Sequence, residues 1–278
     1  MDTLEYRIEL CQAVAEQLTQ YLQTLPAEAW CHPSACAAWE VRDVVGHLIA
    51  GAEAYAKAIS RGLQGDSAPR LDDIPSPGAP NRAAVIAQRS IARRESLGEH
   101  LLATFTASHH HLQDLMRNLS PQDWETPCSY PGGDIRPAHQ FLAVRLMELA
   151  MHAWDIWSLR DPTRPLFAES VPLVLERLPR IVANNARPDT QLRSPFRYRF
   201  AVTGAVPSQH DIVFEGDAVR MEPAGTLPAD VQCQCDMETF VLIMYGRLTP
   251  QTAGANGRLM VEATRDPMRT FGAWFKFP

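Results

Sequence analysis

The stretch HQFLAVRLMELAMHAWDIWSLR, residues 139–160, determines how the first half of this chain is interpreted. Its apolar residues lie on nearly every side of a helix, which is typical of a helix buried inside a bundle. Four titratable residues interrupt them at spacings of three, four and three: Arg145, Glu148, His152 and Asp155. These spacings place all four on one helical face, where a buried carboxylate needs a partner or must take up a proton.

Glu148 and His152 stand four residues apart, so both side chains can reach one point in space. Inward-facing carboxylates and imidazoles of this kind bind metal ions in helical bundles. The alternative is purely structural, with a Glu–His hydrogen bond and an Arg145–Asp155 ion pair inside the core. This helix alone favours neither interpretation.

A third candidate ligand, His47, lies in the apolar helical pattern VRDVVGHLIAG, residues 41–51. It borders the apolar face, where a lone histidine is most often a core residue with a hydrogen-bond partner. Taken with Glu148 and His152, it completes a set of three ligands that leaves a fourth position open, as in catalytic zinc sites. Arg145 and Asp155 would then orient the ligands or contact substrate. Several divalent ions accept such ligands, so the identity of the metal stays open.

The periodicity along the chain predicts two different halves. Helical spacing of apolar residues predicts helices over 2–24, 40–62, 82–118 and 138–160, with a proline-rich loop at 66–81. After residue 162, alternation predicts strands over 196–205, 210–216, 218–223, 231–236 and 257–263, with helices over 168–186, 237–247 and 266–275. We therefore expect an α+β protein, with a metal-binding four-helix bundle over 1–162 and a small mixed α+β domain over 163–278.

Composition excludes several classes of function. The formal net charge is −6 with no clustered basic stripe, which argues against a nucleic-acid partner. The chain has no apolar run of about 18 residues, so no membrane span is expected. The first residues, MDTLEYRIEL, do not resemble a signal peptide, and a cytoplasmic location with reduced cysteines is the default expectation.

The three consecutive histidines at 109–111 point in different directions on a helix and cannot share one metal ion.

Two segments carry a resemblance to a known family. SACAAWEVRDVVGHL, residues 34–48, and VRLMELAMHAWDI, residues 144–156, resemble the DinB-like superfamily, in particular its mycothiol-dependent maleylpyruvate isomerase branch. The matching positions are Trp39, Val41, Arg42, Asp43 and His47, followed by Arg145, Glu148, His152 and Asp155. The resemblance implies that His47, Glu148 and His152 bind the metal. It also implies a C-terminal domain similar to sterol-carrier-protein-2 folds.

The resemblance further implies mycothiol as a thiol cosubstrate, activated at a divalent cation that is expected to be zinc. A thiolate could then attack a small electrophilic substrate, giving either S-transfer or cis–trans isomerisation of the maleylpyruvate type. Compared with the plain isomerases of this branch, the chain is expected to have an additional proline-rich loop at 66–81 and an additional helix at 168–186. These additions favour S-transfer as the first hypothesis and isomerisation as the second. A non-catalytic metal- or ligand-binding regulator is the third. Arg247, which follows an apolar helix, is the candidate for an anionic group in the second half. Cys36 is an alternative nucleophile, because it lies just before a helix N-terminus.

Overall fold

The computed structural model describes residues 3–36, 39–69, 74–75, 79–184, 194–204, 206–262 and 271–272. Contacts divide the chain into two compact units, Met1–Ser170 and Val171–Pro278. The first unit is helical and the second is built on a sheet, so the expected α+β fold class is confirmed. The sequence placed the boundary after residue 162, before the short 3-10 helix Ala168–Ser170 that closes the first unit.

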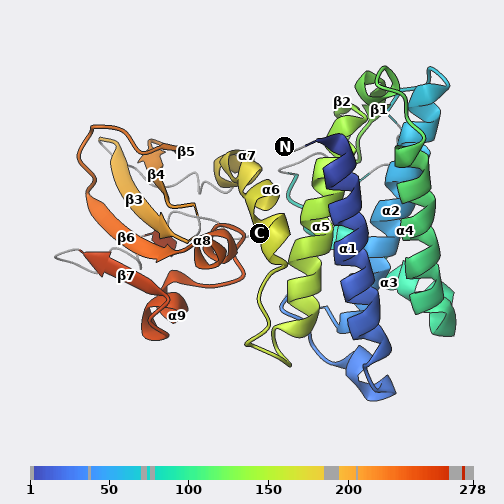
Figure 1. Cartoon of the computed structure of the whole chain (residues 1–278), viewed down its shortest axis with the longest axis horizontal. Helices are drawn as coiled ribbons and strands as arrows, with labels where there is room; N and C mark the ends of the chain where they lie inside the picture. Colours follow the sequence, from blue (N-terminus) through green and yellow to red (C-terminus); the bar gives the residue numbers. More distant parts are fainter. Residues whose placement is uncertain are drawn as a thin grey trace. The chain divides into compact units, whose positions relative to one another are not determined.

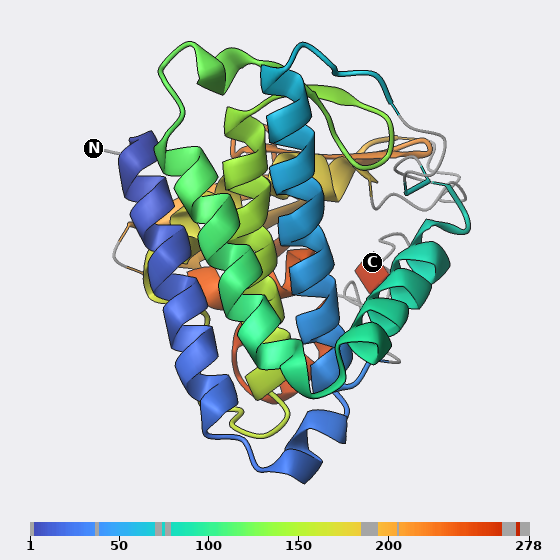
Figure 2. The same ribbon diagram turned by 90° about the vertical axis from the view of Figure 1, so that its right-hand side faces the viewer.

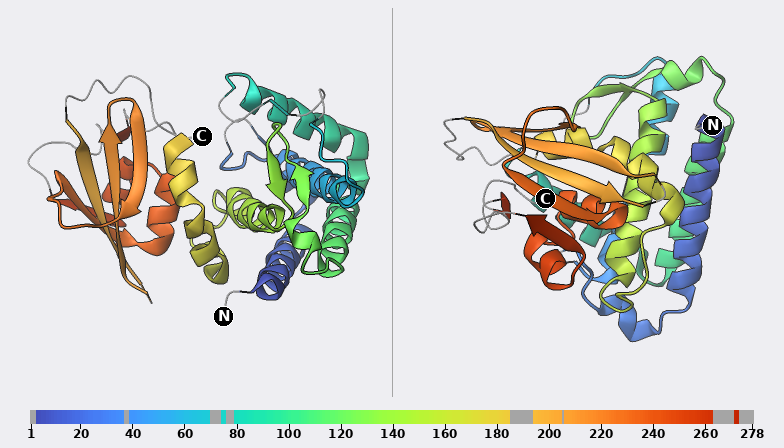
Figure 3. Two further views of the ribbon diagram at one scale, coloured as in Figure 1. Left: turned by 90° about the horizontal axis from the view of Figure 1, so that it is seen from above. Right: turned by 60° about the vertical axis from the view of Figure 1, so that its left-hand side comes forward.

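Four long helices form the bundle of the first unit. They are α1 (Leu4–Gln23), α2 (Val41–Leu63), α4 (Leu101–Arg117) and α5 (His139–Trp157). α1 packs against α4 and α5, and α2 packs against the same two helices, which closes a ring of four. Figure 2 shows the four side by side, and the left view of Figure 3 shows them nearly end-on. Their contact is apolar, with Leu18, Val44, Phe105 and Leu149 at most 1% exposed.

The single helix expected over 82–118 is wrong. The chain forms α3 (Arg82–Leu97), a 3-10 turn (Gly98–His100) and then α4. Gly98 has φ of +52°, a backbone conformation that a helix cannot contain and that glycine adopts without strain. α4 therefore fills the fourth place in the bundle, and α3 packs outside the ring on α2.

Shorter elements complete the first unit. A 3-10 helix (Ala27–Cys31) joins α1 to α2, and another (Asp123–Glu125) follows α4. The segment 120–137, which is rich in proline and glycine, also contains the antiparallel hairpin β1 (Pro127–Ser129) and β2 (Ile135–Pro137). α2 packs on β1, where a Cβ on Gly62 would meet Sγ of Cys128 at 2.6 Å. The hairpin thus lies close against the end of α2.

The second unit contains one five-stranded sheet of order β5-β4-β3-β6-β7, seen in Figure 1. Its strands are β3 (Phe196–Thr203), β4 (Ser208–Glu215), β5 (Ala218–Pro223), β6 (Val231–Asp236) and β7 (Leu259–Glu262). β3 and β6 run parallel and the other neighbours antiparallel. The alternation in β6 buries Cys233 and Cys235 and exposes Gln232 and Gln234, as expected for the strand that the sequence predicts. Burial raises the pKa of both thiols to about 12.

Short helices accompany this sheet. They are α6 (Val171–Glu176), α7 (Leu178–Asn184), α8 (Met237–Met244) and α9 (Pro250–Ala255). α8 packs on β3 and β6, and α6 and α7 pack on α8. The prediction of a continuous helix over 168–186 is wrong. The helix is interrupted at Arg177, between α6 and α7 and two residues before Pro179. The helix expected over 266–275 lies outside the described residues except for 271–272.

Candidate metal centre

Glu148 is the centre of a group of three side chains. Its Oε2 lies 3.2 Å from Nε2 of His152, one turn further along α5. The same oxygen lies 2.9 Å from Nε2 of His47, which comes from α2. The two imidazole rings are 4.8 Å apart and nearly perpendicular. The structure thus brings together the three residues that the sequence predicted as a ligand set.

The second nitrogen of each imidazole is also held. Nδ1 of His152 lies 2.8 Å from Oδ2 of Asp155, whose side chain is fully buried. Nδ1 of His47 lies 3.4 Å from the hydroxyl oxygen of Ser90 on α3. A metal-binding histidine commonly donates its other N–H to such an oxygen, which fixes the tautomer and leaves Nε2 to bind the ion. The donor set therefore fits a divalent cation at the Nε2 atoms and Glu148, all within 4.8 Å of one another.

Burial and hydrogen bonding shift the three pKa values in different directions. Burial lowers the pKa of His47, against a hydrogen bond to Glu148. Burial acts in the same direction on His152, but hydrogen bonds to Asp155, Cys36 and Glu148 outweigh it and raise that pKa well above 6.5. For Glu148, burial is outweighed by hydrogen bonds from His152 and His47, which hold its pKa well below 4.5. Glu148 is thus an anion at neutral pH, as a ligand for a cation must be.

α2 and α3 are joined close to this group. Oδ2 of Asp43 accepts a hydrogen bond from the backbone N–H of Glu40 at 3.0 Å and thereby caps α2. Its Oδ1 accepts from Nε of Arg94 on α3 at 2.9 Å. One helical turn from His47, Asp43 thus fixes both the start of α2 and the position of the helix that carries Ser90.

Trp39 lies beside the two histidines. Its ring centroid is 5.2 Å from that of His47 and 6.2 Å from that of His152. An indole at this distance excludes water from one side of the imidazoles and restricts their rotation. Its fluorescence is therefore a natural reporter of an ion bound between them.

These observations coincide with a family assignment. The sequence matches the model of the family "Mycothiol maleylpyruvate isomerase N-terminal domain" over residues 11–157. The chain belongs to this family. The match confirms the resemblance drawn from the two motifs and the expectation of an enzyme of the isomerase or transferase kind. No curated protein matches the chain.

Solved structures show the same fold over 96% of this chain. A crystal structure of the mycothiol-dependent maleylpyruvate isomerase matches with a TM-score of 0.65 at 15% identity, covering 96% of each chain. A mutant of that enzyme matches with a TM-score of 0.64 at the same identity and coverage. A sterol carrier protein 2 like 2 from Aedes aegypti covers 38% of this chain at 16% identity, with a TM-score of 0.26. The two full-length matches establish the architecture of both halves.

Cys36 lies at the same centre, which the sequence did not reveal. Its Sγ is 3.0 Å from Oδ2 of Asp155 and 3.7 Å from Nδ1 of His152. Cys36, His152 and Asp155 form a second group whose ligand atoms are close enough to share an ion. Cys36 precedes α2 and Asp155 ends the polar face of α5, so only the packing of the two helices brings them together.

The other predicted site residues have different positions. Arg145 is 1% exposed, and its Nη1 donates to the carbonyl of Leu48 at 2.8 Å. An ion pair with Asp155 does not form, because ten residues of helix separate the two by about 15 Å. Arg247 belongs to the second unit, where Nη1 donates to the carbonyl of Tyr245 at 3.1 Å, and its functional role stays a prediction.

The remaining expectations concern features outside the centre. On α4, His109 is buried and His110 and His111 are exposed, so these residues do not converge. Among the described residues, the helices are all too short or too polar to cross a membrane. The cytoplasmic location stays a prediction.

Proposed function

We propose that this chain is a mycothiol-dependent metalloenzyme that performs cis–trans isomerisation of a small electrophile, with His47, Glu148 and His152 as the ligands of a divalent cation. The convergence of both Nε2 atoms on Glu148 carries the proposal. The family match favours isomerisation over S-transfer, which the sequence analysis placed first. Zinc suits two imidazoles and one carboxylate with an open position, although other divalent ions accept the same ligands.

The cation would supply one thing: it lowers the pKa of a thiol so that a thiolate is present at neutral pH. The chain's residues do the rest. Asp155 holds His152 in the tautomer that leaves Nε2 free, and Ser90 lies against Nδ1 of His47. His47 and Glu148 also line a pocket, so the ligand group borders a space that a substrate can enter.

Isomerisation by a thiolate is balanced without a further reactant. The thiolate adds to one carbon of a cis double bond conjugated with a carbonyl, and the electron pair moves to the carbonyl oxygen. The former double bond is then single and rotates. Return of the electron pair expels the thiolate and leaves the trans isomer, so that no thiol is consumed. S-transfer differs only in that the adduct is protonated and released.

The first experiment is metal analysis by mass spectrometry. We expect about one divalent ion per wild-type chain and loss of that ion in His152→Ala and Glu148→Gln. His110→Ala, which removes an exposed histidine of α4, is the matched control and should keep the ion. Equal metal content in all four proteins would refute the ligand set.

The second experiment separates the three functions. Metal-loaded protein is supplied with mycothiol and maleylpyruvate, and the thiol and the product are both quantified. Isomerisation predicts fumarylpyruvate with undiminished thiol, and S-transfer predicts one thiol consumed per product. A protein that binds metal, forms no product and shows no change in melting temperature with mycothiol would be a non-catalytic binder.

A further inference from the structure

Two tyrosines line the pocket that borders the proposed metal ligands. Tyr55 comes from α2 and Tyr130 from the turn between β1 and β2, and both face this pocket of about 160 Å³. Their rings stack at a centroid distance of 6.0 Å. Because His47 and Glu148 line the same pocket, a molecule inside it can contact the ligand group and a phenol at the same time.

The ring of Tyr130 is held from several directions. Cζ of Arg136 lies 3.6 Å from its centroid, and Nη2 of that arginine donates to Oδ2 of Asp134 at 2.7 Å. The ring of Phe141 on α5 meets it edge-on at a centroid distance of 5.5 Å. The backbone N–H of Tyr130 donates to the carbonyl of Asp134 at 2.7 Å and closes the turn. A donor fixed in this way needs no reorganisation when a charge develops beside it.

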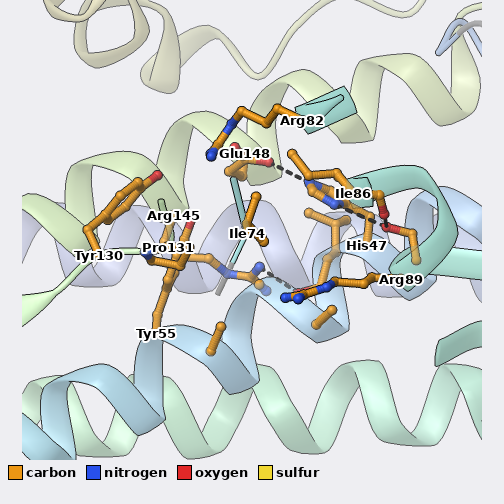
Figure 4. Close-up of a pocket in the computed structure, with 15 residues that line it drawn as sticks. His47, Tyr55, Ile74, Arg82, Ile86, Arg89, Tyr130, Pro131, Arg145 and Glu148 are labelled. Atoms are coloured by element: carbon orange, nitrogen blue, oxygen red, sulfur yellow. Dashed lines mark hydrogen bonds and ion pairs between the residues drawn. The ribbon is translucent and has the colours of Figure 1, made fainter. Parts of the chain in front are cut away.

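The two phenols differ in their access to the pocket. Tyr55 is only 6% exposed, and burial, reinforced by the neighbouring Tyr130 and Glu148, raises its pKa well above 10. Tyr130 is half-buried, and Figure 4 shows its ring directed toward the side of the pocket on which Glu148 lies. A guanidinium over the face of a phenol ring withdraws electron density and makes its O–H a better donor. Tyr130 is therefore the phenol best placed to donate to a bound molecule.

The proposed reaction creates a negative oxygen at some distance from the attacked carbon. The thiolate adds to one end of a C=C–C=O unit, and the electron pair moves to the oxygen at the other end. The site therefore needs a hydrogen-bond donor in the same pocket as the ligand group but on a different wall. A hydrogen bond to an oxyanion is about twice as strong as one to a neutral carbonyl, so such a donor favours the transition state over the ground state.

We propose that Tyr130 is a catalytic residue that donates its phenolic O–H to the carbonyl oxygen of the electrophile and stabilises the enolate. The inference rests on the proposed function for the reaction that it serves. The O–H bond of Tyr130 stays intact throughout. The hydrogen bond strengthens while the oxygen carries the electron pair and weakens when the pair returns and expels the thiolate. Tyr55, which stacks on Tyr130, is a positioning residue.

Turnover of the metal-loaded enzyme tests the role of this hydroxyl. Tyr130→Phe keeps the ring and its contacts with Arg136 and Phe141, so the variant should retain the metal ion and the melting temperature of the wild type. Its kcat should fall by about 100-fold, as for other single donors to an oxyanion, with KM within a few-fold. Tyr6→Phe, which removes a hydroxyl from an exposed position of α1, is the matched control and should keep the wild-type kcat.

A second measurement does not depend on catalysis. The anion 4-nitrophenolate is a planar, coloured mimic of an enolate, and its absorption band moves to shorter wavelength when its oxygen accepts a hydrogen bond. We expect it to bind the wild type and Tyr6→Phe with this shift. Tyr130→Phe should bind it about 10-fold more weakly and with a smaller shift, because a hydrogen bond to a charged oxygen is lost.

The two measurements separate this inference from the proposed function. Equal 4-nitrophenolate affinity and equal spectra in Tyr130→Phe and Tyr6→Phe, or no binding to the wild type, would overturn the inference. A wild-type kcat in Tyr130→Phe would overturn it as well, while leaving the isomerase in place. Binding that depends on Tyr130 in a protein that performs no isomerisation would show that the donor stands although the proposed function fails.

Discussion

Nδ1 of His152 and Oδ2 of Asp155 lie 2.8 Å apart, with the carboxylate fully buried three residues further along the same helix. If either side chain turned away, both would lose a buried hydrogen bond. Asp155 therefore determines which face of the imidazole ring is presented to Glu148.

The first prediction concerns this contact. Asp155→Asn keeps the shape of the side chain but removes the anionic acceptor, so metal affinity should fall by about 10- to 100-fold. Competition with a chromophoric chelator measures it. Asp114→Asn, on an exposed part of α4, should leave affinity unchanged. Unchanged affinity in Asp155→Asn would mean that His152 does not bind the ion through Nε2.

A second prediction separates an external thiol from a protein nucleophile. Cys36 contacts Asp155 and His152, so it is close enough to the centre to be mistaken for the reactive thiol. Because mycothiol supplies the nucleophile in the proposed reaction, Cys36→Ala should retain one metal ion and mycothiol-dependent turnover within a few-fold of the wild type. A substrate adduct on Cys36, found by mass spectrometry together with loss of turnover in the variant, would contradict the proposal.

The third prediction concerns the close approach of α2 and α3. A Cβ on Gly46 would meet the backbone oxygen of Ser90 at 2.7 Å, so Gly46→Ala must push α3 outward and should cost about 1–3 kcal/mol of stability. A Cβ on Gly51 would meet only Nη1 of Arg145, at 3.9 Å. Gly51→Ala should therefore gain up to about 1 kcal/mol from helix propensity. Opposite shifts in the urea midpoint would confirm the difference; a common shift would refute it.

A fourth prediction concerns pH. Burial, reinforced by Arg145, lowers the pKa of His109 to about 3, against 6.5 for an ordinary histidine. The unfolded chain thus takes up a proton below pH 6.5 that the folded chain refuses, so stability falls as pH decreases from 6.5 toward 3. This one residue contributes about 1 kcal/mol per pH unit in that range.

Urea unfolding at pH 7 and pH 5 measures this contribution. His109→Gln, which can still hydrogen-bond Gln12, should lose less stability between the two pH values than the wild type. His110→Gln, exposed on the next position of α4, should behave as the wild type does. An unchanged pH dependence in His109→Gln would show that His109 does not titrate in this way.

Local spacing was sufficient to predict part of the site. Glu148 and His152 meet because four residues make about one helical turn, and that relation is complete within one helix. The strands were also predicted from local spacing, because the alternating residues of β6 are alternately buried and exposed. The three-residue strands β1 and β2 are too short to show a period, and the sequence gives no sign of them.

Relations between helices were not predictable in this way. Cys36 is brought to Asp155, Ser90 to His47, and Arg94 to Asp43 by the packing of separate elements. Within the described part of the chain, Nε and Nη2 of Arg145 have no hydrogen-bond partner, which is equally invisible in the sequence, where helical spacing suggested an ion pair with Asp155. Each of these features depends on three-dimensional neighbours rather than on periodicity.

The turn at Gly98 separates a helix of the bundle core, α4, from a helix that packs outside it, α3. α4 contributes Leu101, Phe105, Leu112 and Met116 to the bundle core, whereas Ser90 is the one buried residue of α3. The side of the pocket formed by α3, which includes Arg82, Ile86 and Arg89, is therefore carried by a helix on which the bundle depends little. Natural variation along this face can alter which molecules are accepted while the fold is preserved, so α3 is where relatives with different substrates should diverge fastest.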